Sequence, residues 1–393
     1  MSLTVSQRVQ RVKPSPTMAV TALAAELRAQ GRDVIGLGAG EPDFDTPAHI
    51  KAAGIAAIEA GRTKYTNVDG TPELKDAIIA KFRRDNGLEY GRDQILVSCG
   101  AKQTCYNVCV AVLNPGDEAV VPAPYWVSYP DMIKLAEGEP VIVPAGIDEG
   151  FKISPRALKA AITNRTRLVF LNSPSNPTGA AYSRDELRAL GEVLLEHPGI
   201  VVATDDMYEH IYWAEEPFTS LGAACPELMD RIVTINGVSK CYAMTGWRIG
   251  YCGGPQKLIA AMKKIQGQST SNPCSISQAA SVAALNGDQG CVADMVRAFR
   301  ERHDYLVAAL NEIPGLHCLP GAGTFYAFPN AAEAIAAKGL ADDTALAELL
   351  LNEANVALVP GSAFGAPGYL RLSFACGLET LQEAIRRIRR VLG

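Results

Sequence analysis

The chain has 393 residues, of which 48% are hydrophobic and 20% charged, a composition typical of a globular protein with more than one core. The formal net charge is −5, with no long Lys/Arg run, which argues against nucleic acid or an anionic membrane as the main partner. The ten cysteines form no C-x-x-C pair and no zinc-type spacing, so we expect reduced thiols and no metal site. No apolar run approaches a membrane span and no signal-type segment begins the chain, so we expect a cytoplasmic protein.

The N-terminal region predicts an arm and one helix. Residues 1 to about 18 would form the arm, which ends at Pro14-Ser15-Pro16, and residues 19–30 a helix that Gly31 closes. A strand-like VIGLG and the turn-rich GAGEPDFDTP follow. These glycines do not fit G-x-G-x-x-G and no helix follows directly, which argues against a dinucleotide site.

From residue 48 onward, helices alternate with short apolar strands. The pattern predicts helices at 48–60, 72–86, 101–112, 154–162 and 184–196, and strands at 94–98, 118–122, 140–144, 167–171, 200–204 and 231–235. Continuous apolar strands in such an alternation favour an α/β fold, with a mostly parallel sheet that helices cover on both faces.

The pattern changes after about residue 300. Helices are expected at 295–310, at 343–353 and from Glu379 onward, with strands at VALVP and YLRLSFA. We therefore expect three parts. Residues 1–47 would form the arm and part of a small domain, residues 48–299 a large domain, and residues 300–393 the rest of a small α+β domain that packs with the N-terminal segment.

The informative polar residues follow the predicted strands. Cys99-Gly100-Ala101-Lys102 comes after the first, Asn172 to Gly179 after the fourth, Asp205 to Tyr208 after the fifth, and Asn236 to Lys240 after the sixth. Ligands of parallel α/β sheets bind beyond the carboxyl ends of the strands. These segments therefore predict one shared pocket.

Lys240 and Arg248 stand out in IVTINGVSKCYAMTGWRIG, because no other charged residue lies between them. Lys240 is either a solvated loop lysine or a desolvated amine suited to Schiff-base chemistry, with Arg248 placed for an anion. The other positions also allow two interpretations. Gly100 to Lys102 form either a tight turn or a phosphate-binding helix start, and Asp205 is either a helix N-cap or the partner of a cation. If these residues have no functional role, Asn176 would be a turn residue, and Trp126 and Tyr208 would be aromatic residues of the core.

The order of the motifs resembles the class I aminotransferases of pyridoxal-phosphate fold type I, in particular the bacterial aspartate aminotransferases. The resemblance rests on KPSPTMAV, GAGEPDFDTP, TKYT with GTPELKDAI, PYWVSYP, NSPSNPTGA, TDDMYEH, NGVSKCYAMTGWRIGY and YLRLSFA, and it covers nearly the whole chain. It implies a large domain with a seven-stranded-type, mostly parallel sheet, a smaller α+β domain from both chain ends, and the cofactor pyridoxal 5′-phosphate.

The resemblance implies catalytic roles for Lys240, Asp205 and Tyr208. Lys240 matches the lysine that binds the cofactor covalently and moves the substrate proton, and Asp205 the partner of the pyridine nitrogen. Tyr208 and Asn176 match the partners of the phenolic oxygen, and Trp126 the aromatic that stacks on the ring.

Arg248 matches the phosphate-binding arginine, which the backbone of Gly100, Ala101 and Lys102 assists. Tyr65 matches a tyrosine that reaches the phosphate of a neighbouring subunit, which implies a homodimer with shared active sites.

For the substrate, Arg371 matches the arginine that binds the α-carboxylate, with the backbone of Gly40 as a second contact and Asn176 and Trp126 adjacent. Lys13, in the arm, is a candidate for the distal carboxylate. Relatives often have alanine where this chain has Thr324 and Ser239; Thr324 would bear on side-chain preference, and Ser239 receives no role.

The implied reaction is a ping-pong transfer of the amino group of aspartate to 2-oxoglutarate, with prephenate as a further acceptor. Two alternatives use the same fold: an aminotransferase for aromatic or aliphatic amino acids, and a pyridoxal-phosphate-dependent β-lyase. A third is a non-catalytic ligand-binding protein. It is disfavoured because the aminotransferase-like region takes up the full length.

Overall fold

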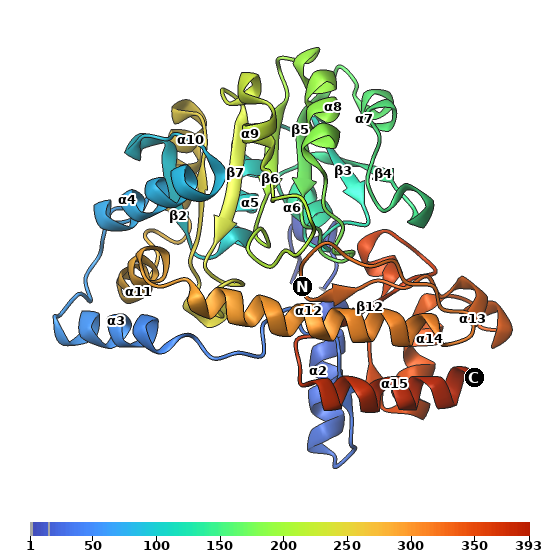
Figure 1. Cartoon of the computed structure of the whole chain (residues 1–393). Coiled ribbons are helices and arrows are strands. Elements are labelled where there is room, and N and C mark those ends of the chain that lie inside the picture. The colour runs from blue at the N-terminus through green and yellow to red at the C-terminus, as the bar shows by residue number, and fades with distance from the viewer. Residues whose placement is uncertain (1–2, 15) are drawn as a thin grey trace.

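A computed structural model describes residues 3–14 and 16–393, and its central feature is a seven-stranded sheet (Figure 1). The strand order is β2-β8-β7-β6-β5-β3-β4, and every strand except β8 points the same way. The strands are β2 (Ile95–Ser98), β3 (Glu118–Ala123), β4 (Glu139–Pro144), β5 (Thr166–Asn172), β6 (Val201–Asp205), β7 (Ile232–Gly237) and β8 (Gly250–Gly253). The α/β fold and its mostly parallel sheet are confirmed.

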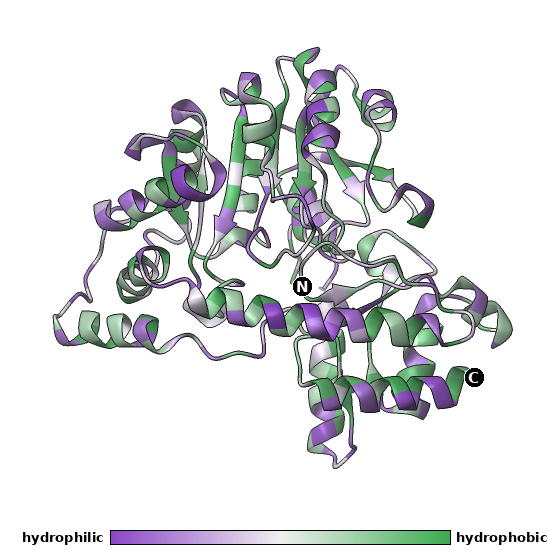
Figure 2. Ribbon diagram, in the orientation of Figure 1, coloured by the Kyte–Doolittle hydropathy of each residue, from purple (hydrophilic) through white to green (hydrophobic). Residues whose placement is uncertain are grey.

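Helices cover both faces of the sheet because its buried strands are apolar on both sides. In β5, Leu168 and Phe170 pack in the cluster that contains α5, whereas Val169 and Leu171 pack in the cluster that contains α8. Figure 1 shows α8 in front of the sheet and α5 behind it. Figure 2 shows the strands as hydrophobic along most of their length, and α12 and α15 as mixed.

The five helices that the sequence predicts between residues 48 and 196 begin at or next to the expected residues, and the helix predicted from residue 295 begins earlier, at Gly290. The sequence predicts no helix at residues 129–135, 221–224, 256–267 or 275–286. Thr71, Ser154 and Ser183 are N-caps whose side chains accept a backbone N–H of the first turn, so the starts of α4, α7 and α8 are set locally. A π-helical turn at Phe82–Asn86 continues α4. The helices are α3 (Ala48–Glu59), α4 (Pro72–Lys81), α5 (Ala101–Val112), α6 (Tyr129–Leu135), α7 (Pro155–Ala161), α8 (Arg184–Leu195), α9 (Leu221–Ala224), α10 (Gln256–Gly267), α11 (Ser275–Asn286) and α12 (Gly290–Asn311).

The chain also forms two small sheets, of which the first joins the N-terminal region to the C-terminal region. β1 (Ile35–Gly36) pairs in parallel with β10 (Val356–Ala357), and the second sheet has the order β11-β12-β9. The remaining elements are α1 (Gln7–Gln10), α2 (Pro16–Ala29), β9 (Tyr326–Ala327), α13 (Ala332–Ala337), α14 (Asp343–Leu349), β11 (Val359–Pro360), β12 (Leu370–Ser373) and α15 (Leu378–Leu392). The predicted strand VALVP is thus two short strands.

The N-terminal arm differs from its prediction. It contains α1, and α2 begins at Pro16 rather than at residue 19, because the first turn of a helix needs no N–H from proline. Ser15 and residues 1 and 2 lie outside the described residues. The domain boundaries stay a prediction, and α12 runs without a break through residues 299 and 300.

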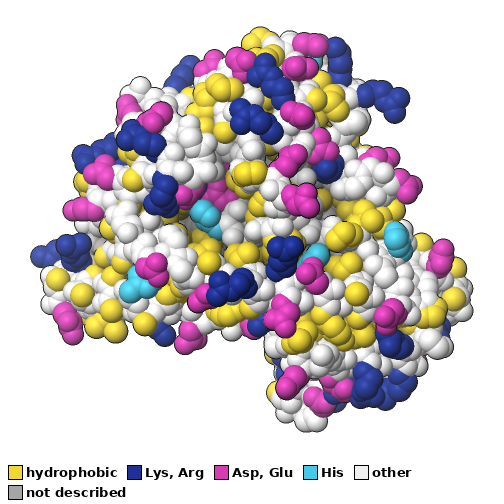
Figure 3. Space-filling model, viewed as in Figure 1, with side chains coloured by type: hydrophobic (Ala, Val, Ile, Leu, Met, Phe, Trp, Pro, Cys, Tyr) yellow, Lys and Arg dark blue, Asp and Glu magenta, His cyan; other side chains and the backbone are white. Residues whose placement is uncertain are grey.

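The described surface, helices and cysteines add three observations. On the face in Figure 3, basic and acidic side chains are interspersed. Within residues 3–14 and 16–393, no helix combines the length and the apolar character that crossing a membrane requires. Each of the ten cysteines is a free thiol.

Gly250 packs β8 directly against the start of α5, and this contact yields a stability prediction. A methyl group at Gly250 would lie 2.6 Å from the Ala101 Cα and closer still to its backbone nitrogen. We expect Gly250→Ala to lower the free energy of unfolding by about 1–3 kcal/mol, the usual effect of overpacking. Chemical denaturation measures it. Gly199→Ala is the control because its methyl group meets nothing within 4 Å; equal stability of the two variants would contradict the prediction.

Candidate active site

A cavity of about 500 Å³ lies beyond the carboxyl ends of the central strands. Its walls come from the segments after β5, β6 and β7, from the start of α5, from α2, and from β9 and β12. The predicted site residues on its wall are Gly40, Ala101, Lys102, Trp126, Asn176, Asp205, Tyr208, Lys240, Arg248 and Arg371. The structure thus brings together most of the residues that the sequence singled out, from positions more than 300 residues apart.

Lys240 follows the end of β7, and its amine faces the cavity. Its Nζ donates to the carbonyl oxygen of Gly40 at 2.6 Å. Burial lowers the pKa of this amine to about 8, and the positive charges of Arg248 and Arg371 act in the same direction. Lys240 therefore holds a much larger neutral fraction near neutral pH than an ordinary lysine, and an amine must be neutral in order to act as a nucleophile or base.

Asp205 is the last residue of β6, and its carboxylate is buried. Its Oδ2 accepts a hydrogen bond from the Tyr129 hydroxyl at 2.6 Å, and its Oδ1 accepts one from the Met207 N–H at 3.3 Å. No Lys, Arg or His of the described residues forms an ion pair with it, and burial raises its pKa. The carboxylate therefore favours a cationic partner in the cavity.

Arg371 lies on β12 and is 2% exposed. Its Nη2 donates to the Gly38 carbonyl at 2.7 Å and its Nη1 to Asn176 Oδ1 at 3.0 Å, while its buried Nε has no hydrogen-bond partner. The guanidinium lies over the rings of Tyr326 and Phe364, at 4.4 and 4.9 Å from their centroids. An orphaned donor on a rigid, buried guanidinium indicates an anionic ligand, and a carboxylate suits its planar shape.

Tyr208 and Asn176 present further donors. The Tyr208 hydroxyl lies 3.0 Å from the hydroxyl of Tyr326, and burial raises its pKa well above the ordinary value. Because Asn176 Oδ1 accepts from Arg371, the amide group of Asn176 remains as a donor.

A second anion site lies at the start of α5. Gly100, with a φ of +84°, precedes the helix, and a methyl group there would collide with the Arg248 guanidinium. Arg248 has no carboxylate partner among the described residues, and it donates only to the Thr245 carbonyl, at 2.8 Å. Lys102 adds charge, with its Nζ 5.0 Å from the centroid of Trp126, and burial lowers its pKa. Free N–H groups of a helix start beside an arginine favour a phosphate.

Two predicted residues lie away from this cavity. Tyr65 is 91% exposed and lines a separate surface depression with Arg62 and Ser275. Lys13 is exposed in the arm, although Thr17 and Met18 line the cavity. The roles of Tyr65 and Lys13 stay predictions.

Ser239 and Thr324 are the two residues that differ from the alanine often found in relatives. Ser239 is buried at the cavity wall. Thr324 adopts a φ of +70°, and its Oγ1 accepts from the Tyr326 N–H at 3.2 Å.

Sequence reasoning missed Tyr129 and Tyr326. Each hydroxyl contacts a predicted site residue. From the sequence, however, each tyrosine would be predicted as a core residue, because it lies in an apolar stretch. Tyr129 meets Asp205 across 76 positions of sequence, and no local pattern encodes that contact.

Comparison with known proteins identifies the family. The family model for aminotransferase class I and II matches residues 32–388. The chain belongs to this family. The aspartate/prephenate aminotransferase of Nitrosomonas europaea is 58% identical over 98% of this chain and 99% of its own, and that of Cereibacter sphaeroides 56% over 98% and 97%.

Solved structures agree with this assignment. The aspartate aminotransferase of Rhizobium meliloti has a TM-score of 0.95 at 48% identity, and covers 100% of this chain and 99% of its own. That of Thermus thermophilus with maleate has a TM-score of 0.94 at 42% identity, with full coverage of both chains. The family and the fold expected from the motifs are confirmed, and the protein is an aminotransferase.

The electrostatics of the aminotransferase cavity predict how Lys240 titrates. In protein freed of any cofactor, we expect its amine to titrate near pH 8 rather than near 10.5, and Arg248→Gln to move the midpoint to higher pH because a neighbouring positive charge is removed. NMR of protein with ¹³C-labelled lysine measures the midpoint. Arg167→Gln, near the amino-terminal end of β5 and not on the cavity wall, is the control. A wild-type midpoint near 10.5 would contradict the electrostatic argument.

Proposed function

We propose that this aminotransferase uses pyridoxal 5′-phosphate to transfer the amino group of aspartate to 2-oxoglutarate, and that prephenate is a further acceptor. One observation carries the proposal: two side chains with complementary roles lie on one cavity wall. They are Lys240, whose pKa is lowered, and Arg371, whose Nε has no hydrogen-bond partner. The names of the relatives at 58% and 56% identity support these substrates, as does the maleate, a dicarboxylate, of the Thermus structure.

Pyridoxal 5′-phosphate fits the chemistry of the residues that line the cavity. Arg248 and the backbone of Gly100, Ala101 and Lys102 would hold its phosphate, because these donors lack an anionic partner. Trp126 would lie against its ring, with Asp205, Tyr208 and Asn176 as hydrogen-bond partners. When bound, the cofactor supplies an aldehyde that takes up the amino group and a ring that accepts electrons.

Substrate binding and proton transfer would then fall to different residues of the chain. The guanidinium of Arg371 would bind the α-carboxylate of the amino acid and orient the α-carbon towards Lys240, with the backbone at Gly40 beside it. Lys240 Nζ, once neutral, would remove the proton from the α-carbon of the amino acid. It would then give up this proton at a second position before the half-reaction ends. Because the amino acid and the 2-oxo acid both carry an α-carboxylate, the same arginine and lysine would serve both half-reactions. The first product would then leave before the second substrate binds, which gives ping-pong kinetics.

The assembly and location belong to the same proposal. We infer a homodimer in the cytoplasm, in which Tyr65 of one subunit completes the phosphate site of the other. The exposure of Tyr65, together with exposed Ile55 and Ile58 on α3, supports a surface that a second copy would cover. Lys13 is proposed as a contact to the distal carboxylate, since Thr17 nearby in the sequence lines the cavity.

Replacement of the carboxylate-binding arginine tests the substrate pose. We expect Arg371→Lys to lower kcat/KM for aspartate by about 10- to 100-fold, because an ammonium cannot form the paired hydrogen bonds of a guanidinium. Steady-state kinetics with both substrates measure the loss. Arg389→Lys, which changes an exposed ion pair with Glu312, is the matched control. Unchanged kinetics in Arg371→Lys would exclude the proposed pose.

A panel of amino donors and 2-oxo acids tests the substrate assignment. We expect the highest kcat/KM for aspartate with 2-oxoglutarate, and measurable transfer to prephenate, in a coupled assay in which Lys240→Ala provides the blank. A preference for aromatic or aliphatic donors would move the enzyme to that class of aminotransferase. Release of pyruvate and ammonia from cysteine conjugates, with aspartate inert, would instead assign a β-lyase.

A further inference from the structure

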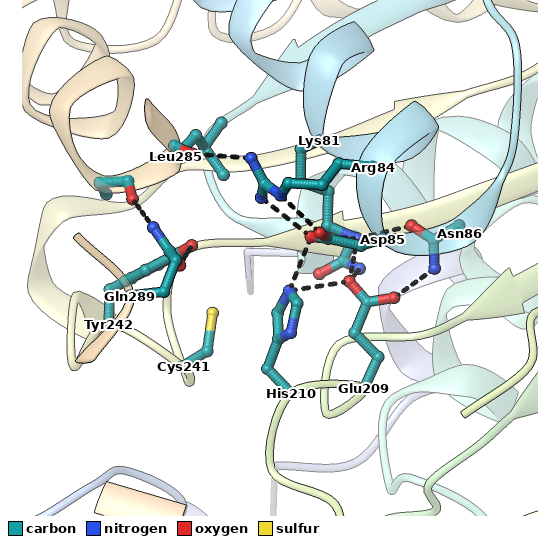
Figure 4. A network of polar contacts seen from close by, with 12 residues as sticks. Lys81, Arg84, Asp85, Asn86, Glu209, His210, Cys241, Tyr242, Leu285 and Gln289 are labelled. Atoms are coloured by element: carbon teal, nitrogen blue, oxygen red, sulfur yellow. Dashed lines mark hydrogen bonds and ion pairs between the residues drawn. The ribbon is translucent and has the colours of Figure 1, made fainter. Parts of the chain in front are cut away.

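A buried network of charges and amides lies next to the active-site cavity, around the carboxylate of Glu209 (Figure 4). Glu209 is 5% exposed, and Lys81, at the end of α4, is 1% exposed and pairs with Glu209 Oε1. Two amides also donate to this carboxylate. Asn86 Nδ2 donates to Oε2 at 2.6 Å, and Asn236 Nδ2 donates to Oε1 at 2.7 Å. None of these four residues belongs to the proposed cofactor or substrate contacts.

This network is a built one rather than a vacant cation site. Asp85, Glu209 and His210 place their ligand atoms within 4.8 Å of one another, a spacing that a metal ion would accept. The ammonium of Lys81, however, already lies against Glu209 and 3.7 Å from Asp85 Oδ2. Burial acts to raise the pKa of Glu209, but the charges of Lys81 and His210 and the hydrogen bonds from Lys81 and Asn86 together hold that pKa below its ordinary value. Glu209 is therefore a compensated anion.

The network joins two segments that carry catalytic groups. Glu209 directly follows Tyr208, in the loop that begins at Asp205, and Asn236 lies at the end of β7, four residues before Lys240. The backbone pairing of β6 with β7 ends where the Asp206 N–H donates to the Ile235 carbonyl at 2.9 Å. Beyond that point, the bond from Asn236 to Glu209 is the one hydrogen bond between residues 207–211 and 236–240 in the described chain.

Asn236 also fixes its own segment. Its Oδ1 accepts the N–H of Gly237 at 2.7 Å, so both ends of the amide are used. Gly237 in turn packs tightly, because a methyl group there would lie 2.9 Å from the Met207 side chain and 3.1 Å from the Ile249 carbonyl. A change in this amide therefore acts directly on the turn that leads to Lys240.

We propose that Glu209 and Asn236 are positioning residues of the aminotransferase. Their hydrogen bond holds the Lys240 segment against the loop of Asp205 and Tyr208. The inference rests on the proposed role of Lys240 but not on the identity of the amino donor. Asn86 donates to the other carboxylate oxygen, from the π-helical turn that follows α4. That turn is far from Lys240 in the sequence, so Asn86 serves as the comparison for Asn236.

The experiment compares Asn236→Ala with Asn86→Ala. Each variant removes one amide donor from Glu209 and one amide acceptor, which serves the Gly237 N–H in Asn236 and the Lys81 ammonium in Asn86. Lys81 and Glu209 themselves are unchanged in both variants. The first readout is the titration of Lys240 by NMR in cofactor-free protein, which needs no substrate. We expect Asn236→Ala to move the midpoint to higher pH, because a displaced amine becomes better solvated, and Asn86→Ala to leave it unchanged. The second readout is kcat, expected to fall about 10- to 100-fold in Asn236→Ala only, the scale of a misplaced catalytic group.

Denaturation of both variants separates positioning from general destabilisation. Equal shifts of the Lys240 midpoint in the two variants, or no shift in Asn236→Ala, would overturn the proposal. If Asn236→Ala does not fold, Asn236→Ser takes its place, since the shorter serine side chain keeps a polar group at this position but does not reach Glu209. A further outcome is that the wild-type enzyme fails to act on aspartate while the Lys240 midpoint still shifts in Asn236→Ala and not in Asn86→Ala. That result would count against the substrate assignment and support the positioning role.

Discussion

The site depends on positive charge that the chain itself does not neutralise. Lys102, Lys240, Arg248 and Arg371 all face one cavity, while Asp205 and Glu41 are the acidic residues on its wall. Like charges in a partly desolvated space repel one another, and the lowered pKa of Lys240, caused first by burial and then by Arg248 and Arg371, is the measurable result. In the proposed function, two anions would relieve this repulsion: a phosphate at Arg248 and a carboxylate at Arg371. Ligand binding and the folding of this edge of the sheet are therefore coupled through charge.

The sheet makes this concentration of charge possible. Parallel strands end at one edge, so each βα connection places a short polar segment there, and the apolar strands hold those segments in fixed register. The close contact of Gly250 with Ala101 lets β8 approach the start of α5, and Gly100 leaves room for the Arg248 guanidinium. Arg371 comes from the other part of the chain, yet the Gly38 carbonyl and two aromatic rings fix its guanidinium before any ligand arrives. Such preorganisation lowers the entropic cost of binding.

The parts of this architecture that the sequence predicts are those with a local cause. The six parallel strands follow from continuous apolar runs, and helix starts such as those at Thr71 and Ser183 follow from their caps. Strand β8 was missed because Gly250 and Gly253 leave no apolar run, and α2 began earlier than expected because Pro16 is tolerated in a first turn. In the site, Lys240 stood out by its apolar surroundings. Tyr129, Tyr326 and the Glu209 network did not, because their meaning lies in contacts between segments that are distant in sequence.

The loop after β6 shows how two buried carboxylates take different parts. Glu209 has its own cation, Lys81, and two amide donors, so its charge is compensated inside the protein. Asp205, four residues earlier, receives only a hydroxyl and a long N–H contact, and burial raises its pKa. A compensated carboxylate gains little from a ligand, whereas an uncompensated one is stabilised by a cationic group that enters the cavity. The first therefore suits a role in holding the loop and the second a role in binding. Because Asp205 ends β6 and Tyr208 and Glu209 lie in the loop that follows, a loop held by Glu209 would hold Asp205 and Tyr208 in the positions that the proposed chemistry requires.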